Sequence, residues 1–340
     1  MSHDTIPAPR ATAALILGLF SSAAVASADT SKLTVYTYDS FVSEWGAGPG
    51  IEEAFESQCN CRLDFIALDG APSILQRLRL EGEETRADVV LGLDMNLMQA
   101  ARDTGLLAPH GADLSPLALP IDWQDETFVP YDWGPFAFVY DTQMISDPPS
   151  SLEELADAPE EFKIIIQDPR TSTPGLGLLL WIKHAYGDEA DEVWRRLQDN
   201  ILTVTRGWSE AYFSLFMNGE APMVLSYATS PAYHMAVEGS DRYRAAKFDE
   251  GHYLQVEVAA MTRATGNPEL AREFLEFMLT RDFQQHIPLG NVMYPAIELG
   301  DALPEAFTRL IDPEVFTFPP QEVHENRRAW IDEWLNVSTR

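Results

Sequence analysis

The sequence predicts an α/β protein in which mainly parallel sheets are flanked by helices. Short apolar or β-branched runs alternate with helical patterns through short polar turns, which is typical of parallel strands joined by helices. Two long extended segments interrupt this alternation at residues 128–140 and 253–261. A length of 340 residues, at roughly 150 residues per domain, favours about two domains.

The first residues have the pattern of a secretory signal peptide. Residues 13–25 form an apolar run that is too short to span a bilayer comfortably, and Ala26, Ser27 and Ala28 fit a small-residue cleavage site. We therefore assign residues 1–28 to a cleaved signal peptide and expect an exported, periplasmic protein. No later stretch is long and apolar enough to span a membrane, so we expect no direct membrane insertion.

Three strand and helix units begin the mature chain. Strands are expected at residues 33–38, 63–68 and 87–91. A helix-capping residue follows each strand, and Asp39, Asp69 and Asp94 stand at or near these positions. The helices are expected from Ser40 to about Gln58, over residues 72–80, and from Asp94 to just before Gly105.

Three further units lie between the two extended segments. Strands are expected at 163–167, 202–205 and 223–227, with helices over 176–186, from Trp208 to near Gly219, and from Pro231 onward. The simplest arrangement is a second lobe inserted into the first, with the extended segments as crossovers and hinge. This gives a first lobe at 29–135, a second lobe at 136–255, and a completion of the first lobe at 256–340 whose last helix covers residues 322–335.

The charge balance limits the possible partners. There are 23 Lys and Arg against 53 Asp and Glu, a formal net charge of -30. A nucleic-acid-binding protein needs a basic surface to displace counterions from phosphates, so we expect no nucleic-acid partner. The negative charge either keeps the protein soluble or attracts a cation toward a cleft, and we favour the first role.

The chain has two cysteines, Cys59 and Cys61, separated by one residue. In an oxidising compartment they form either a disulfide or two free thiols, and the sequence leaves both open. A metal site would need further soft ligands nearby, and the histidines are scattered, so we expect no metal ion.

Two strand ends carry candidate anion-binding groups. Thr171, Ser172, Thr173 and Pro174 join a strand to a helix that begins near Thr173 and Pro174. Free amides and the positive helix end at such a position hold a phosphate, although most capped helices bind nothing. The segment Tyr227 to Pro231 repeats the pattern, with Ser230 as the expected cap and Ala228 and Thr229 in the turn.

Aromatic residues at the strand ends form a second group of candidates. Tyr38, Trp208 and Tyr227 fall at loop edges where ligands collect in α/β sheets, with Trp45 and Tyr233 nearby. Aromatic faces stack on flat heterocycles and attract cations, although most such residues only pack in cores. Asp69, followed by Gly70, either shapes a turn or provides a carboxylate that accepts hydrogen bonds from an amino-heterocycle or offsets a cation.

Enzyme motifs are absent from the sequence. The segment Gly207 to Ala211 lacks the final glycine of a nucleophile elbow, and no Walker-type loop occurs. We therefore predict a binding protein with no catalytic residues and no cofactor.

Several long motifs resemble the periplasmic thiamine-binding proteins of ABC importers. They are VYTYDSF (35–41), ADVVLGLD (87–94), QDPRTSTPGLGLLLW (167–181), GWSEAY (207–212), LSYATSPAY (225–233) and EGHYLQVEVAA (250–260). The resemblance extends from about Leu33 to Trp334. It implies a type II periplasmic binding protein fold whose two lobes close around thiamine, thiamine monophosphate or thiamine diphosphate. It also implies a monomer whose partners are a membrane permease and its ATPase.

The resemblance also implies a set of ligand-binding positions. In that family the ligand contacts positions that match Asp69, Gly70, Ser172, Thr173, Trp208 and the run Tyr227, Ala228, Thr229, Ser230 and Pro231. Tyr38, Trp45 and Tyr233 match aromatic positions near the ligand. Ala228, Gly70 and Val292 depart from the family pattern, Val292 standing where a tryptophan is expected.

Other functions remain as alternatives. A receptor of the same fold for a polyamine would need acidic residues around aromatics, and one for ferric ion would need clustered tyrosine, histidine or carboxylate ligands. A secreted thiamine-processing enzyme would need a nucleophile in the cleft.

Overall fold

The strands of the protein pair in one continuous order, which divides into two half-sheets. The computed structural model describes Met1 and residues 31–338, so the predicted signal peptide lies outside the described residues apart from Met1. The strand order is β2-β1-β3-β9-β4-β7-β5-β6. The strands are β1 (Lys32–Tyr38), β2 (Arg62–Leu68), β3 (Val89–Asp94), β4 (Val129–Asp141), β5 (Ile164–Gln167), β6 (Ile201–Thr205), β7 (Met223–Tyr227), β8 (Tyr243–Ala245), β9 (His252–Met261), β10 (Tyr294–Pro295) and β11 (Val315–Phe316).

Strand β4 joins the two half-sheets. Its residues 129–135 pair with β9, and its residues 136–141 pair with β7 and β8. The first half-sheet contains parallel β1, β2 and β3, and the second contains parallel β5, β6 and β7. Strands β4 and β9 therefore add antiparallel pairs to two parallel units, as expected if the extended segments act as crossovers. The predicted lobe boundaries stay a prediction.

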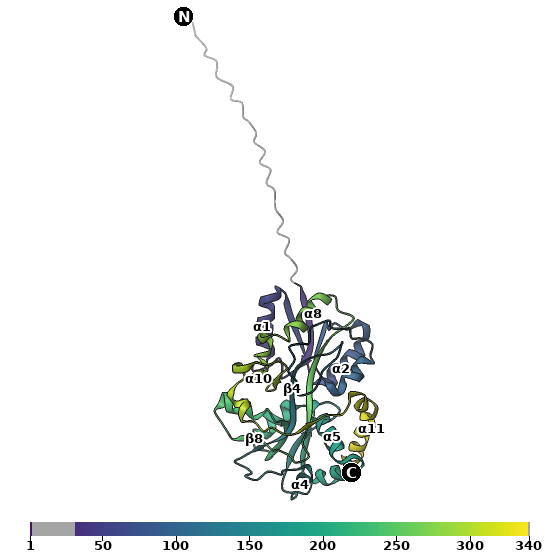
Figure 1. Cartoon of the computed structure of the whole chain (residues 1–340), viewed down its shortest axis with the longest axis vertical. Helices are drawn as coiled ribbons and strands as arrows, with labels where there is room; N and C mark the ends of the chain where they lie inside the picture. The colour runs from purple at the N-terminus through teal and green to yellow at the C-terminus, as the bar shows by residue number, and fades with distance from the viewer. Residues whose placement is uncertain (2–30, 339–340) are drawn as a thin grey trace. The chain divides into compact units, whose positions relative to one another are not determined.

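Helices cover both half-sheets. Figure 1 shows α1, α2 and α8 around the first half-sheet and α4 and α5 around the second, with β4 running between them. The helices are α1 (Gly48–Cys59), α2 (Ala71–Glu81), α3 (Met98–Arg102), α4 (Leu152–Ala156), α5 (Thr173–Tyr186), α6 (Ala190–Leu197), α7 (Pro231–Tyr233), α8 (Pro268–Phe277), α9 (Arg281–Gln284), α10 (Ile287–Gly290) and α11 (Pro320–Ser338). Among the described residues, no helix has the length and apolar character needed to cross a membrane.

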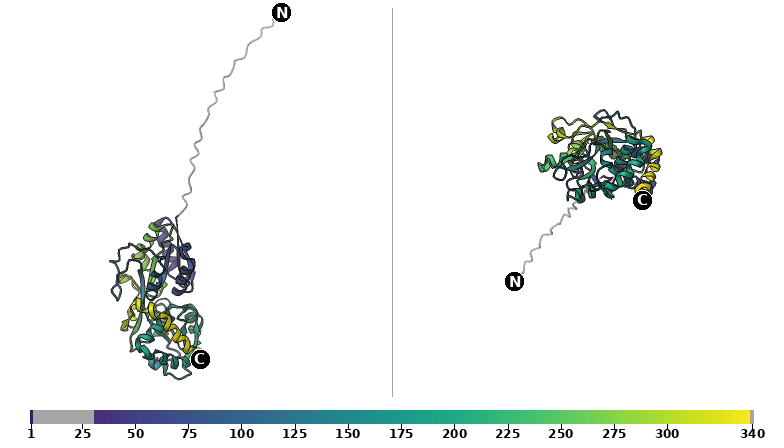
Figure 2. Two further views of the ribbon diagram at one scale, coloured as in Figure 1. Left: turned by 90° about the vertical axis from the view of Figure 1, so that its right-hand side faces the viewer. Right: turned by 90° about the horizontal axis from the view of Figure 1, so that it is seen from below.

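The C-terminal helix α11 contacts elements on both sides of β4. It packs against α5 and α6 on one side and against α3 and the short helix η2 (Met95–Leu97) on the other. Both views in Figure 2 show this yellow helix against the teal residues of the second half-sheet. Lys183 pairs with Glu333, and Trp194 meets Trp334 edge to face. The predicted last helix at 322–335 is thus found within a longer one.

The first predicted helix begins later than expected. Residues 39–47 form turns, and α1 starts at Gly48 instead of Ser40. Pro49 occupies the first turn of α1, where its missing N–H costs nothing, whereas the middle of a longer helix would not accommodate it. The amide of Gly48 donates to the carbonyl of Phe41 at 2.7 Å, which closes the turn segment.

Two predicted helices next to the second half-sheet are wider than α-helices. The segment η5 (Glu210–Phe216) is a π-helix, and α7 continues into a second π-helix, η6 (His234–Glu238). Long π-helical turns are rare and frequently stand at functional sites. Both segments begin near Ser209 and Ser230, which line the pocket described below.

Cys59 and Cys61 form a disulfide, with Cα atoms 5.1 Å apart. The bond lies at the end of α1, where Asn60 has the left-handed backbone conformation that asparagine tolerates. The structure thus decides between the two possibilities left open for these cysteines.

Candidate functional site

A pocket opens between the two half-sheets. It lies beyond the carboxyl ends of β1, β2 and β7 and at the beginning of α5, as expected for an α/β sheet. Its lining residues are Tyr38, Asp39, Ser40, Trp45, Asp69, Gly70, Ala71, Ser172, Thr173, Pro174, Trp208, Ser209, Tyr227, Ser230, Glu257, Asn291, Val292 and Met293.

One end of the pocket is the N-terminus of α5. Ser172 is the N-cap residue, yet its hydroxyl makes no capping hydrogen bond, and Thr173 is the first helical residue. Both residues are buried and line the pocket. Gly175 allows the helix to start this close to β5, because a Cβ atom there would lie 2.4 Å from the carbonyl oxygen of Gln167. Hydroxyl groups and a positive helix end thus face the same space, which is suited to an anion.

One wall of the pocket is the indole of Trp208. Its Nε1 donates to the hydroxyl of Ser226 at 2.7 Å, and the Ser226 hydroxyl lies 2.8 Å from that of Ser230. Tyr212 stacks on the indole with ring centroids 5.1 Å apart and planes 23° apart. Because the ring is held both by a hydrogen bond and by stacking, it offers a fixed flat surface to a ligand ring.

A smaller apolar cavity adjoins this wall. Trp45, Trp208, Ser230 and Val292 line both cavities, and Tyr233 lines the smaller one. Val292 has a backbone φ of 54°, in the left-handed region that a β-branched residue rarely adopts. The wall therefore includes a strained backbone position at Val292.

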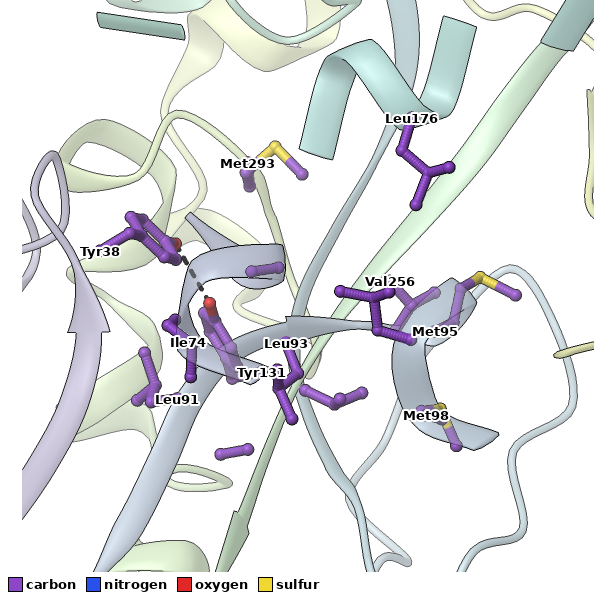
Figure 3. Packing of buried hydrophobic residues seen from close by; sticks show 14 of the residues in the cluster. Tyr38, Ile74, Leu91, Leu93, Met95, Met98, Tyr131, Leu176, Val256 and Met293 are labelled. Carbon is purple, nitrogen blue, oxygen red and sulfur yellow. Dashed lines mark hydrogen bonds between the residues drawn. The ribbon is translucent and has the colours of Figure 1, made fainter. Parts of the chain in front are cut away.

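The floor of the pocket is built around Tyr38. Its hydroxyl donates to Oε2 of Glu257 at 2.6 Å. The same hydroxyl lies 3.1 Å from that of Tyr131, as the dashed line in Figure 3 marks. Gly92 makes room for the ring, because a Cβ atom there would come within 2.4 Å of it. Burial, followed by the negative charge of Glu257, raises the pKa of Tyr38 well above its usual range. Tyr38 is therefore a neutral hydrogen-bond donor at neutral pH.

Asp69 lies at the mouth of the pocket and is paired with a cation of the chain itself. Its Oδ2 atom lies 2.7 Å from Nη2 of Arg206, and both side chains are largely exposed. Asp69 follows β2 and Arg206 follows β6, so this ion pair connects the two half-sheets across the opening. A Cβ atom on Gly70 would lie 3.5 Å from the carbonyl oxygen of Thr171, which shows how closely the edges approach.

Most of the predicted site residues meet at this pocket. Those that line it are Tyr38, Trp45, Asp69, Gly70, Ser172, Thr173, Trp208, Tyr227 and Ser230. Those that do not line it are Ala228, Thr229, Pro231 and Tyr233. Whether each residue contacts a ligand stays a prediction.

The residues outside the lining have other surroundings. Thr229 is buried, with its hydroxyl 3.7 Å from the sulfur of Met293. Ala228 and Pro231 face a separate cavity near Tyr140. Ser230 is the N-cap residue of α7 and Pro231 begins the helix, as predicted. The Ser230 hydroxyl makes no capping hydrogen bond to the helix, because it accepts from the amide of Tyr227.

Sequence reasoning missed the polar residues on the pocket floor. Glu257 lies in the interior of β9, and Asn291 lies in the loop after α10. The signal for Glu257 was present, because Gln255 and Glu257 are polar residues in the interior of a mainly apolar strand that is buried throughout. Polar groups in such a strand need partners, which points to a buried network or a ligand. Nowhere in residues 31–338 are three or more His, Cys, Asp or Glu side chains grouped so that they could hold a metal ion.

Comparison with known proteins identifies the family. The model of the family described as bacterial extracellular solute-binding protein matches residues 84–325. The thiamine-binding periplasmic protein of Brucella abortus is 53% identical over 310 residues, which cover 91% of this chain and 92% of that protein. Its counterpart from Escherichia coli is 53% identical over 309 residues, covering 91% and 94%.

A solved structure shows the same fold. It is described as a periplasmic thiamin binding protein, is 52% identical, and superposes with a TM-score of 0.89 over 92% of this chain and 97% of its own. The predicted two-lobed α/β fold is confirmed by this likeness, and so is the resemblance drawn from the sequence motifs. The chain belongs to the family of bacterial extracellular solute-binding proteins.

Proposed function

We propose that this chain is a periplasmic receptor that binds thiamine, thiamine monophosphate and thiamine diphosphate in the pocket between the half-sheets. The observation that carries the proposal is the pairing, in one pocket, of a fixed aromatic wall at Trp208 with free hydroxyls at the beginning of α5. Thiamine has flat rings and a cationic thiazolium, and its esters add a phosphate. The relatives named for thiamine binding support this choice of ligand.

The two ends of the pocket would bind different parts of the ligand. Trp208, Trp45 and Tyr227 offer aromatic faces that stack on the rings and attract the thiazolium cation. Ser172 and Thr173 would receive the phosphate of the esters, where hydroxyls and helix amides donate hydrogen bonds. Unphosphorylated thiamine lacks this last interaction.

The proposed role is delivery without chemical change. Two-lobed receptors bind ligands by hinge closure, and β4 is the strand through which such a motion would pass. The closed, loaded receptor would present the vitamin to a membrane permease driven by a cytoplasmic ATPase. We assign the chain no catalytic residue, no cofactor and no partner subunit of its own kind.

Isothermal titration with the three thiamine forms tests the proposal. We expect a dissociation constant of micromolar or tighter, about 8 kcal/mol or more of binding free energy, for at least one form. Ser172→Ala should weaken binding of the phosphate esters and leave thiamine itself nearly unchanged. The matched control is Ser151→Ala, which removes a helix-capping hydroxyl at α4, outside the pocket. Absence of heat with all three forms would refute the proposal.

A polyamine receptor is the second candidate function. The specific observation in its favour is the buried carboxylate of Glu257 beside Tyr38 at the pocket floor, since polyamine sites combine acidic and aromatic residues. Spermidine and putrescine therefore belong in the same titration. Binding of either one more tightly than thiamine would favour this second function.

A further inference from the structure

We propose that Glu257 is the group that makes the pocket specific for a cationic ligand, and that Asp132 opposite it holds a proton. The floor of the pocket then carries one negative charge, placed on Glu257. This inference rests on the proposed function, because it names the part of the ligand that the floor recognises. Neither residue was among the predicted site residues.

Three acidic residues stand in register across the centre of the sheet. Glu257 of β9 is the direct cross-strand partner of Asp132 on β4 and of Asp94 on β3. Side chains that are directly opposite in antiparallel strands lie on the same face, about 5 Å apart at their Cβ atoms. Like charges in such positions repel each other, and these residues are between 0% and 6% exposed. Three ionised carboxylates would therefore be strongly unfavourable here.

Glu257 has the hydrogen bonds that a buried carboxylate needs. Its Oε2 atom accepts from the hydroxyls of Tyr38 and Tyr131, both at 2.6 Å, and these two rings converge in Figure 3. Its Oε1 atom accepts from Nε2 of Gln255 at 2.8 Å. Tyr227 in turn donates to Gln255 at 3.1 Å. Glu257 also lines the pocket, so its charge faces the ligand.

Asp132 lacks comparable support. Its Oδ2 atom accepts from the side-chain amide of Asn291, and the same amide nitrogen lies 3.4 Å from Oε2 of Glu257. Its Oδ1 atom is buried without a hydrogen-bond partner. An ionised Asp132 would leave that oxygen uncompensated, whereas a protonated Asp132 becomes a donor toward Glu257.

The pKa shifts of the three acidic residues support this assignment. Burial, and then the charge of Glu257, raises the pKa of Asp132 well above its usual range. Burial also raises the pKa of Glu257, and the hydrogen bonds from Tyr131 and Tyr38 act in the opposite direction. The pKa of Asp94 is raised to about 7, chiefly by burial, and Arg327 of α11 partly offsets this. The ionised member that faces the pocket is therefore Glu257.

The consequence is selection by ligand charge. A cationic ring near Glu257 gains an attraction that an uncharged ring of the same shape does not. Because the carboxylate is largely removed from water, this attraction is screened less than one at the surface. Asp69 contributes less to the selection, since Arg206 already pairs with it.

Titration with a charged ligand and its uncharged analogue tests this inference. The probes are thiamine and 3-deazathiamine, in which an uncharged thiophene replaces the thiazolium ring. We expect the wild-type protein to prefer thiamine by at least about tenfold. In Glu257→Gln the preference should fall to less than about threefold, while the affinity for the analogue is retained. The matched control is Glu250→Gln, outside the pocket, which also removes a carboxylate that accepts from a tyrosine hydroxyl and should keep the wild-type preference.

A measurement on the wild-type protein covers the case in which Glu257→Gln does not fold. Carbon-13 NMR of protein labelled at aspartate carboxyl groups should show a protonated carboxyl at pH 7 that disappears from the spectrum of Asp132→Asn. An ionised Asp132 at pH 7, equal wild-type affinity for the two probes, or full preference in Glu257→Gln would overturn the inference. If the wild-type protein binds neither probe, the proposed function fails as well; if it binds thiamine and the preference survives in Glu257→Gln, only this inference fails.

Discussion

Replacing Trp208 with alanine should weaken thiamine binding by about 10- to 100-fold. The indole donates a hydrogen bond to Ser226 and stacks on Tyr212, so one rotamer is fixed and the other face of the ring is available to a ligand. An aromatic stack contributes about 0.5 to 1.5 kcal/mol and a desolvated cation–π contact up to about 2 kcal/mol. Their combined loss is at most about 3.5 kcal/mol, and the stated range of 10- to 100-fold corresponds to about 1.4 to 2.8 kcal/mol of this, at about 1.4 kcal/mol per factor of ten.

Calorimetric titration of three variants makes this measurement specific. Trp208→Phe keeps a flat ring but loses the donor to Ser226, so its affinity should fall between those of the wild type and Trp208→Ala. Trp330→Phe is the control, because Trp330 packs on Phe318 and does not line the pocket. Thermal melting identifies the folded fraction of each variant. A folded Trp208→Ala protein that binds thiamine within threefold of the wild type would refute the stacking role.

Three further predictions concern stability and the pocket mouth. Asp94→Asn should stabilise the protein by about 4 kcal/mol at most above pH 7 and have little effect near pH 4. The pKa of Asp94 is about 7 in the folded state and 3.8 in the unfolded chain, so ionising this carboxyl removes stability from the wild type as the pH rises through that range. Urea unfolding from pH 4 to 8 measures this effect, and a stability difference between variant and wild type that does not change with pH would contradict it. Arg206→Gln should speed ligand dissociation at low salt by about two- to fivefold, because its ion pair with Asp69 is exposed and contributes little. Stopped-flow measurement of ligand release at low and high salt tests this, and an unchanged low-salt rate would contradict it. Val292→Asn should stabilise by about 1 kcal/mol, since asparagine tolerates the positive φ; an unchanged or lower melting temperature would contradict this.

The sequence was sufficient for the parts of the fold that depend on local patterns. Most strands and the start of α5 at Thr173 were predictable, because hydrophobic periodicity and capping residues act over a few positions. The turn segment before α1 and the π-helix η5 were not. Their geometry depends on packing between distant segments, as the approach of Trp45 to Phe213 shows.

The candidate site was predictable where it consists of strand ends. Aromatic and hydroxyl residues at those ends, such as Trp208 and Ser172, line the pocket. The residues of the pocket floor were not predicted, because the expectation that ligands bind at the carboxyl ends of strands says nothing about residues inside strands. Asp132 and Glu257 become neighbours only through the pairing of β4 with β9, and no local pattern in the sequence specifies that register.

A crystal structure with thiamine monophosphate bound is the most direct measurement of how this pocket works. We predict that the phosphate lies at the hydroxyls of Ser172 and Thr173, that a ring of the ligand stacks on Trp208, and that the cationic ring lies nearest Glu257. A ligand that lies elsewhere on the chain, or that lies in this pocket with its phosphate away from α5, would contradict the proposed binding mode.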